Sequence, residues 1–299
     1  MLELNAQGQF NLATMPLKLH LEGQAGGELL QSYSESITPL GPVQFRLSGD
    51  SRYLDIQING KGELDNGEQL ALAINSHVLV PSSNKQPLTA KLQWEVNATE
   101  AGKHWFPIKG DADLDLSGST LTVNHVLQAP VSASLDGNVN METLAMDLNL
   151  DWEHFDLPLS ETNNIVIDAG VLKVKGELNN LALSLAGAYR LQEQASMNPV
   201  SVEGELDVLQ AIPRGQLGGS VKTPLPAAVS HVFNEVGPFE FEINTNADNA
   251  ALNINSNIRT VNGVLYALDI NSDVHLLDII KAEFNWSAIP VNHDLTASS

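Results

Sequence analysis

The sequence predicts an all-β protein built from a one-layer antiparallel sheet with one apolar face. Apolar and polar residues alternate along most of the 299-residue chain, which is the period of a strand with two different sides. Short turns rich in Asn, Asp and Gly separate the alternating runs, at intervals of about 10 to 12 residues, so we expect on the order of 20 strands. Alternation leaves two architectures open. One is an open sheet curled into a groove, and the other is a closed β-sandwich in which two apolar faces cover each other.

The first clear hairpin covers residues 54–74. Leu54 opens a run in which every second residue is apolar, the run ends at the turn Asp65-Asn66-Gly67, and the alternation resumes at Leu70. Residues 88–96 then alternate Leu, Ala, Trp and Val with Thr, Lys, Gln and Glu. Both segments therefore predict strands with one apolar and one polar face.

Two further hairpins are predicted with explicit registers. Residues 131–141 and 144–152 form one, with a Glu142-Thr143 turn that sets Met141 opposite Leu144. In the second, residues 171–189, a two-residue Asn179-Asn180 loop sets Leu178 opposite Leu181 and Val174 opposite Leu185. Asn tolerates the positive φ of such a turn, and each register gathers the apolar residues of both strands on one side.

The C-terminal third continues the pattern. Residues 200–208 predict a strand, and residues 239–243 and 252–258 predict a hairpin around Asp248-Asn249. After Ile258, a two-residue loop would put Tyr266 on the opposite face. We therefore predict a three-residue loop, Val261-Asn262-Gly263, with Gly263 in the left-handed region.

One stretch departs from alternation. Residues 224–236 (PLPAAVSHVFNEV) place Ala228, Val232 and Val236 four residues apart before Gly237-Pro238, which predicts a short helix. Residues 276–284 fit either a helical turn or a strand with a change of parity. We interpret residues 1–299 as one continuous β segment, interrupted near 211–238 and cut from a longer protein.

Composition excludes several classes of function. A net charge of −21 argues against nucleic acid as a partner, because phosphate binding needs clustered Lys and Arg. The chain has no Cys, its eight His residues are scattered singly, and Asp111, Asp113 and Asp115 alternate with Leu as on a solvated strand face. It also has no GxSxG motif, so we expect no catalytic residue, no metal, no cofactor and no enzymatic activity.

The remaining feature is the apolar face, in which Leu predominates, with Met and Ala. Flexible side chains of this kind suit a surface that grips varied acyl chains, whereas packed sandwiches favour β-branched and aromatic residues. The residue types therefore favour the open groove over the sandwich.

The chain resembles the TamB family within the wider AsmA-like group. The resemblance rests on a strand that ends in Trp152 followed by Phe155, Leu157 and Pro158, on the G-x-L-x-V-x-G-x-L pattern of residues 170–178, and on the short loop before L-x-L-x-L. It is clearest over about residues 130–210. Members are periplasmic β-proteins anchored in the inner membrane and shaped as an apolar groove called a β-taco.

The resemblance implies a function in outer-membrane biogenesis in Gram-negative bacteria. The groove would shelter phospholipid acyl chains during transport between the inner and outer membranes, and the family is also linked to outer-membrane protein assembly with the barrel partner TamA, whose binding region we expect outside this fragment. The rival hypothesis is a structural β-sandwich or scaffold module with no ligand. The residues expected to contact lipid are Leu135, Met146, Leu148, Leu150, Leu172, Val174, Leu178, Leu181, Leu183 and Leu185.

Overall fold

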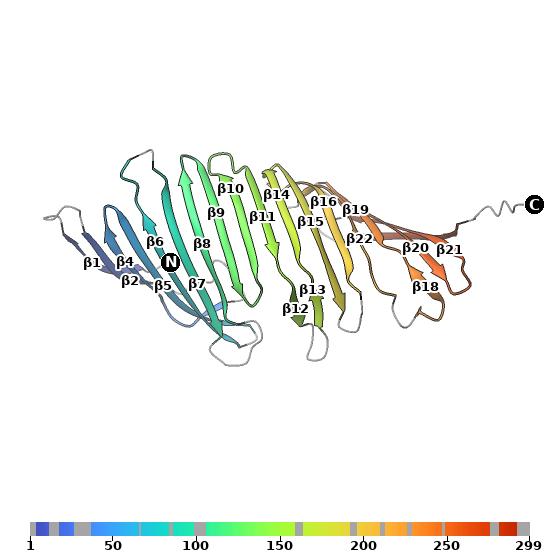
Figure 1. Cartoon of the computed structure of the whole chain (residues 1–299), viewed down its shortest axis with the longest axis horizontal. Coiled ribbons are helices and arrows are strands. Elements are labelled where there is room, and N and C mark those ends of the chain that lie inside the picture. The colour runs from blue at the N-terminus through green and yellow to red at the C-terminus, as the bar shows by residue number, and fades with distance from the viewer. Residues whose placement is uncertain are drawn as a thin grey trace, which may run out of the picture. The chain divides into compact units, whose positions relative to one another are not determined.

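The computed structural model describes residues 4–11, 18–26, 37–65, 67–83, 86–98, 106–158, 164–191, 196–209, 213–225, 229–246, 249–275 and 281–291. All of its regular elements are β-strands, numbered β1 to β22 (Figure 1). The chain divides into two compact units, unit 1 (Met1–Thr143) and unit 2 (Leu144–Ser299). No helix in the described part is long and apolar enough to cross a membrane.

Unit 1 is an antiparallel meander in which the strands pair with their neighbours in chain order, except at one interrupted strand. Its third strand is interrupted after residue 39, and both parts pair with the same neighbour, β5. The strands are β1 (Leu4–Asn11), β2 (Lys18–Ala25), β3 (Ile37–Pro39), β4 (Val43–Asp50), β5 (Tyr53–Leu64), β6 (Gln69–Leu79), β7 (Leu88–Ala98), β8 (Ile108–Ser117), β9 (Thr120–Ala129) and β10 (Ala133–Asn140).

Unit 2 has the same design. β11 pairs with β14 and β12 with β13, so that the first hairpin is broken once on each side. The meander then runs from β14 to β22 in chain order, except that β17 pairs with β19. β18 and β19 both pair with β20. The strands are β11 (Met146–Trp152), β12 (Phe155–Pro158), β13 (Asn164–Ile167), β14 (Gly170–Glu177), β15 (Asn180–Leu191), β16 (Asn198–Asp207), β17 (Arg214–Val221), β18 (Phe233–Val236), β19 (Phe239–Thr245), β20 (Asn249–Thr260), β21 (Leu265–His275) and β22 (Lys281–Pro290).

Each unit is thus an open antiparallel sheet, and the described strands form no second layer against it. This confirms the all-β prediction and the antiparallel sheet. Five described apolar residues are buried (Ala25, Val43, Ala112, Val166 and Leu181), and no large described side chain is completely buried. A closed sandwich of this size would enclose many such side chains, so the structure argues against that alternative.

The predicted three-residue hairpin loop is confirmed. The Thr260 amide donates to the Val264 carbonyl at 2.9 Å, and the Gly263 amide donates to the Thr260 carbonyl at 2.9 Å. Gly263 has a φ of +83°, and Ile258 lies opposite Tyr266. An odd number of loop residues is needed to keep the apolar residues of both strands on the same face. The residue with the positive φ is a glycine, which adopts this conformation without strain.

Two predicted registers are wrong. In the β14–β15 hairpin the loop is Leu178-Asn179, so that Val174 faces Leu183 and Leu181 faces Gly176. Since a shift of two residues keeps every side chain on its face, alternation cannot distinguish the two registers. Met141 and Leu144 do not pair within strands, because the Asn140 carboxamide oxygen accepts from the amides of Glu142 (2.9 Å) and Thr143 (3.0 Å) and bends the chain there.

The short helix predicted over 224–236 is also wrong. Residues 226–228 lie outside the described part, and the Val232 amide bonds to the Val229 carbonyl in a single turn. Residues 233–236 form β18, which pairs with residues 258–260 of β20. The backbone N–H and C=O groups of β20 form hydrogen bonds with this segment. These bonds outweigh the weak helical preference that was predicted from the spacing of only three apolar residues. Of the ambiguous stretch 276–284, residues 281–284 belong to β22 and the others lie outside the described residues.

Candidate functional site

One face of unit 1 is nearly free of polar side chains. Partners in an antiparallel ladder share a face, so the registers of β2 and β4–β10 define this face position by position. All its positions in these strands carry apolar residues or glycine except Ser76 and His125. We call it the apolar face of unit 1. A typical row across it is Gly23, Phe45, Ile58, Ile74, Trp94, Gly110, Leu127 and Ala133.

Unit 2 has an equivalent apolar face. It is defined by the registers of β11, β14–β17 and β19–β22, and no position on it in these strands is charged. Its polar members are few, and Ser272 is buried with a hydroxyl that has no hydrogen-bond partner in the described structure. Two rows across this face are Leu148, Val174, Leu183, Gly204, Leu217, Ile243 and Leu252, and Leu150, Leu172, Leu185, Val202, Gly219, Phe241, Ile254, Ile270 and Trp286.

The structure gathers most of the predicted lipid-contacting residues on the apolar face of unit 2. Met146, Leu148 and Leu150 lie on β11, Leu172 and Val174 on β14, and Leu181, Leu183 and Leu185 on β15, in adjacent positions of one ladder. Leu178 lies in the turn beyond the ladder, and Leu135 lies on β10 in unit 1. All are half-buried except Leu181, which is buried.

Aromatic rings on the apolar faces lie over glycines of neighbouring strands. A Cβ atom built on Gly170 would lie 2.3 Å from Cζ2 of Trp152, and one on Gly187, a strand further, 3.2 Å from the same atom. Phe45 covers Gly23 and Phe241 covers Gly219 in the same way, with ring atoms 2.4 and 2.7 Å from the built Cβ. By contrast, the row of Trp286 continues through Ile270 and Ile254 instead of glycine, and Trp286 is 74% exposed. The glycines therefore let large rings join the face without rising above it.

His125 is the exceptional residue of the unit 1 face. Trp94 reaches across Gly110 on β8 and donates from Nε1 to Nε2 of His125 at 3.0 Å, and the two rings stack with centroids 5.9 Å apart and planes 13° apart. Sequence reasoning treated His125 as one of eight scattered histidines. The available signal was its position, because it occupies an apolar place in the alternation of residues 121–127.

The opposite faces carry charges, amides and hollows. Ion pairs join Arg46 to Glu22 and Lys175 to Asp147, each at 2.6 Å, and Nδ1 of His77 donates a hydrogen bond to the carboxylate of Asp55 at 2.6 Å. Asp111, Asp113 and Asp115 lie on this side of β8. At the turn between β4 and β5, the Arg52 guanidinium bonds to the carboxylate of Asp50 at 2.7 Å and lowers the pKa of that carboxyl below its ordinary value.

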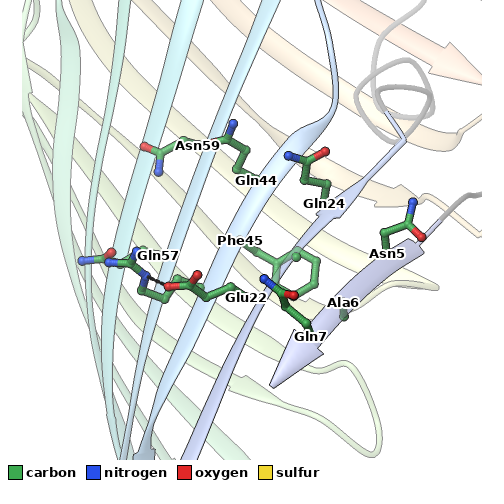
Figure 2. Close-up of a pocket in the computed structure, with 11 residues that line it drawn as sticks. Asn5, Ala6, Gln7, Glu22, Gln24, Gln44, Phe45, Gln57 and Asn59 are labelled. Atoms are coloured by element: carbon green, nitrogen blue, oxygen red, sulfur yellow. Dashed lines mark hydrogen bonds and ion pairs between the residues drawn. The ribbon is translucent and has the colours of Figure 1, made fainter. Parts of the chain in front are cut away.

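One of these hollows lies at the first strands and has a volume of about 610 Å³. Figure 2 shows it lined by amide side chains of β1, β2, β4 and β5 around Glu22. None of the residues predicted to contact lipid lines this hollow or the others described. We attribute this to the lengths of the side chains on the two faces. Long Gln, Glu, Lys and Arg side chains project from the polar faces and enclose hollows between them, whereas on the apolar faces the aromatic rings fill the space above the glycines.

The fold and these faces define the class of the chain, a β-meander protein in which no described strand covers the uncharged side of either sheet. The chain belongs to the TamB family, because the model of the TamB N-terminal domain matches residues 46–211, more than half of its length. No curated protein and no solved structure matches the chain.

Proposed function

We propose that the apolar faces of both units hold the acyl chains of phospholipids and that the chain serves lipid transport between the inner and outer membranes. The observation that carries this proposal is the combination of charge-free strand positions in unit 2, a single imidazole in unit 1, and the lack of any described layer that covers either face. A soluble protein rarely leaves so large an apolar surface without a ligand or partner.

The chemistry of such a face is physical rather than catalytic. Each methylene that leaves water for the sheet contributes roughly 0.8 kcal/mol, so two acyl chains can be held firmly by burial alone. No charged partner fixes their position along unit 2, so the chains can slide from one row to the next. In this proposal each sheet curls into a groove around the chains, and the acidic outer side keeps the protein in water.

The family places this activity in the periplasm, on a protein anchored in the inner membrane, with the outer-membrane barrel TamA as partner and with outer-membrane protein assembly as a second task. We carry these assignments to the present chain as part of the proposal. They are supported by membership of the TamB family rather than by any contact in the structure.

The test is native mass spectrometry of the purified chain, with extraction of bound lipid. Leu183→Asp and Leu148→Asp place a carboxylate on the apolar face of unit 2 and are expected to reduce the phospholipid held by that face at least tenfold, since an ionised group must otherwise be desolvated. The number of lipids per chain should therefore fall, while the lipid held by unit 1 stays. Because both positions are half-buried, the circular dichroism of the sheet is expected to persist.

Two control variants put similar changes on the opposite side. Ser184→Asp introduces the same side chain one residue further along β15, and Lys173→Glu reverses a charge beside it in the ladder. Both are expected to retain lipid. Equal loss of lipid in all four variants would contradict the assignment of the face, and unfolding of only the two Leu variants would favour a closed structural core.

A further inference from the structure

We propose that His125 binds an ester carbonyl oxygen of a diacyl lipid, and so fixes the polar end of the lipid on the apolar face of unit 1. This inference rests on the proposed function and adds to it a specific recognition contact. It is carried by the hydrogen bond between Trp94 and His125 and by the second imidazole nitrogen, which has no hydrogen-bond partner among the described residues.

The hydrogen bond assigns the tautomer of the imidazole. An indole N–H only donates, so Nε2 of His125 must be the acceptor in the 3.0 Å contact. In a neutral imidazole the proton then resides on Nδ1, which becomes a donor. No described residue accepts a hydrogen bond from Nδ1, so this donor remains available to a ligand.

The surroundings select the chemistry of that ligand. His125 lies between Ala112 and Leu135 in its row, and the neighbouring positions Val123 and Leu127 on β9 are also apolar. A ligand that covers these residues must be largely apolar and must present an acceptor oxygen within reach of the imidazole. An acyl ester meets both requirements, because its carbonyl is the first acceptor above the hydrocarbon chain.

Gly110 makes the arrangement possible. A Cβ atom at this position would lie 2.7 Å from Nε2 of His125 and 3.0 Å from Nε1 of Trp94, too close to Nε2 for the imidazole to stay where it is. The glycine thus leaves the room in which Trp94 holds the imidazole. Trp94 is a positioning residue in this proposal, and His125 makes the contact with the ligand.

The experiment is competitive loading of the full chain with equal amounts of a diester phospholipid and its diether analogue of the same chain length. The diether lacks the carbonyl oxygens, and native mass spectrometry resolves the two complexes by mass. Leu183→Asp serves as the background, so that binding to the unit 2 face does not dilute the result. The expected preference for the diester is about three- to tenfold, the range for one hydrogen bond.

His125→Leu is expected to abolish the preference by weakening diester binding, with diether binding unchanged. His125→Gln should retain part of it, because a carboxamide can accept from Trp94 and still donate. His77→Leu makes the same substitution on the polar face and should leave the preference intact. The nitrogen chemical shifts of His125 should also report the proton on Nδ1, and Trp94→Phe should release that tautomer.

If the Leu183→Asp chain with His125 unchanged binds the diester and the diether in equal amounts, this inference is overturned and the proposed function still stands. Failure of both lipids to bind, in this background and in the unsubstituted chain, would overturn the proposed function as well. A proton on Nε2 in the nuclear magnetic resonance spectrum would contradict the geometry from which the inference begins.

Discussion

Substitution of Gly170 by Ala tests whether a glycine controls the height of the apolar face. The new methyl group would lie 2.3 Å from Cζ2 and 2.7 Å from Cε2 of Trp152, and 2.7 Å from the carbonyl oxygen of Ala186. Carbon atoms do not approach so closely, so the indole ring must lift from the sheet. Its Nε1 then loses the 2.9 Å hydrogen bond to the carbonyl of Asp168.

The magnitude follows from these two losses. Forcing one extra methyl group into a packed contact costs about 1–3 kcal/mol, and a hydrogen bond of this kind contributes about 1 kcal/mol. We therefore expect Gly170→Ala to lower the free energy of unfolding by about 2–4 kcal/mol. Gly218→Ala is the matched control, because the nearest atom to its Cβ is a carbonyl oxygen at 3.7 Å. It should change the free energy by less than about 0.5 kcal/mol.

The assay is urea unfolding followed by circular dichroism, in a double-mutant cycle with Trp152→Leu. If the ring is the main obstacle, the cost of Gly170→Ala should fall by at least about 1 kcal/mol when Trp152 is absent. The contact with the Ala186 carbonyl persists in both backgrounds and accounts for the remainder. A coupling energy near zero would refute the reasoning, and so would equal destabilisation by Gly170→Ala and Gly218→Ala.

Two further predictions concern turns that connect neighbouring strands. Gly263→Ala should destabilise the β20–β21 hairpin by about 1 kcal/mol in thermal unfolding, since its φ of +83° strains any L-residue although no atom lies within 4 Å of the new methyl group. Arg52→Gln should raise the pKa of Asp50 in a carboxyl nuclear magnetic resonance titration. The Asp50 contribution to stability is present above the unfolded pKa and is lost as the pH falls through the lower folded pKa. An unchanged pKa of Asp50 in Arg52→Gln would contradict the role of the guanidinium. An unchanged thermal stability in Gly263→Ala would contradict the strain expected at this φ.

Much of the fold could be predicted from sequence because one pattern decides it. Alternation fixes which side each residue of a strand occupies, and the loop parity at Val261-Asn262-Gly263 could be worked out from that pattern alone. Alternation is insensitive to shifts of two residues, so the β14–β15 register was wrong although its faces were right. The helix predicted over 224–236 failed because sheet pairing by β20 is a long-range effect that a local spacing does not contain.

The detail of the site was less accessible. The predicted lipid-contacting residues were chosen by face, and the ladder does bring Leu148, Val174 and Leu183 together in one row. The relation between Trp152 and Gly170, and that between Trp94 and His125, depend on which residues lie opposite and diagonal to one another. To predict such contacts one must know which residues of neighbouring strands are paired, and the residues of the turns alone do not determine this pairing.

The meander has a consequence for how each sheet is assembled. Apart from the interruptions at β3, β12, β13 and β18, the described strands of each unit pair with their neighbours in the chain, so the contacts are short in sequence and the contact order is low. A sheet of this kind can elongate strand by strand from either end, with stability that accumulates from nearest-neighbour terms, as in repeat proteins. Adding or removing a hairpin preserves the parity of all the others. Such a chain can change its length in evolution while one side of it stays continuously apolar.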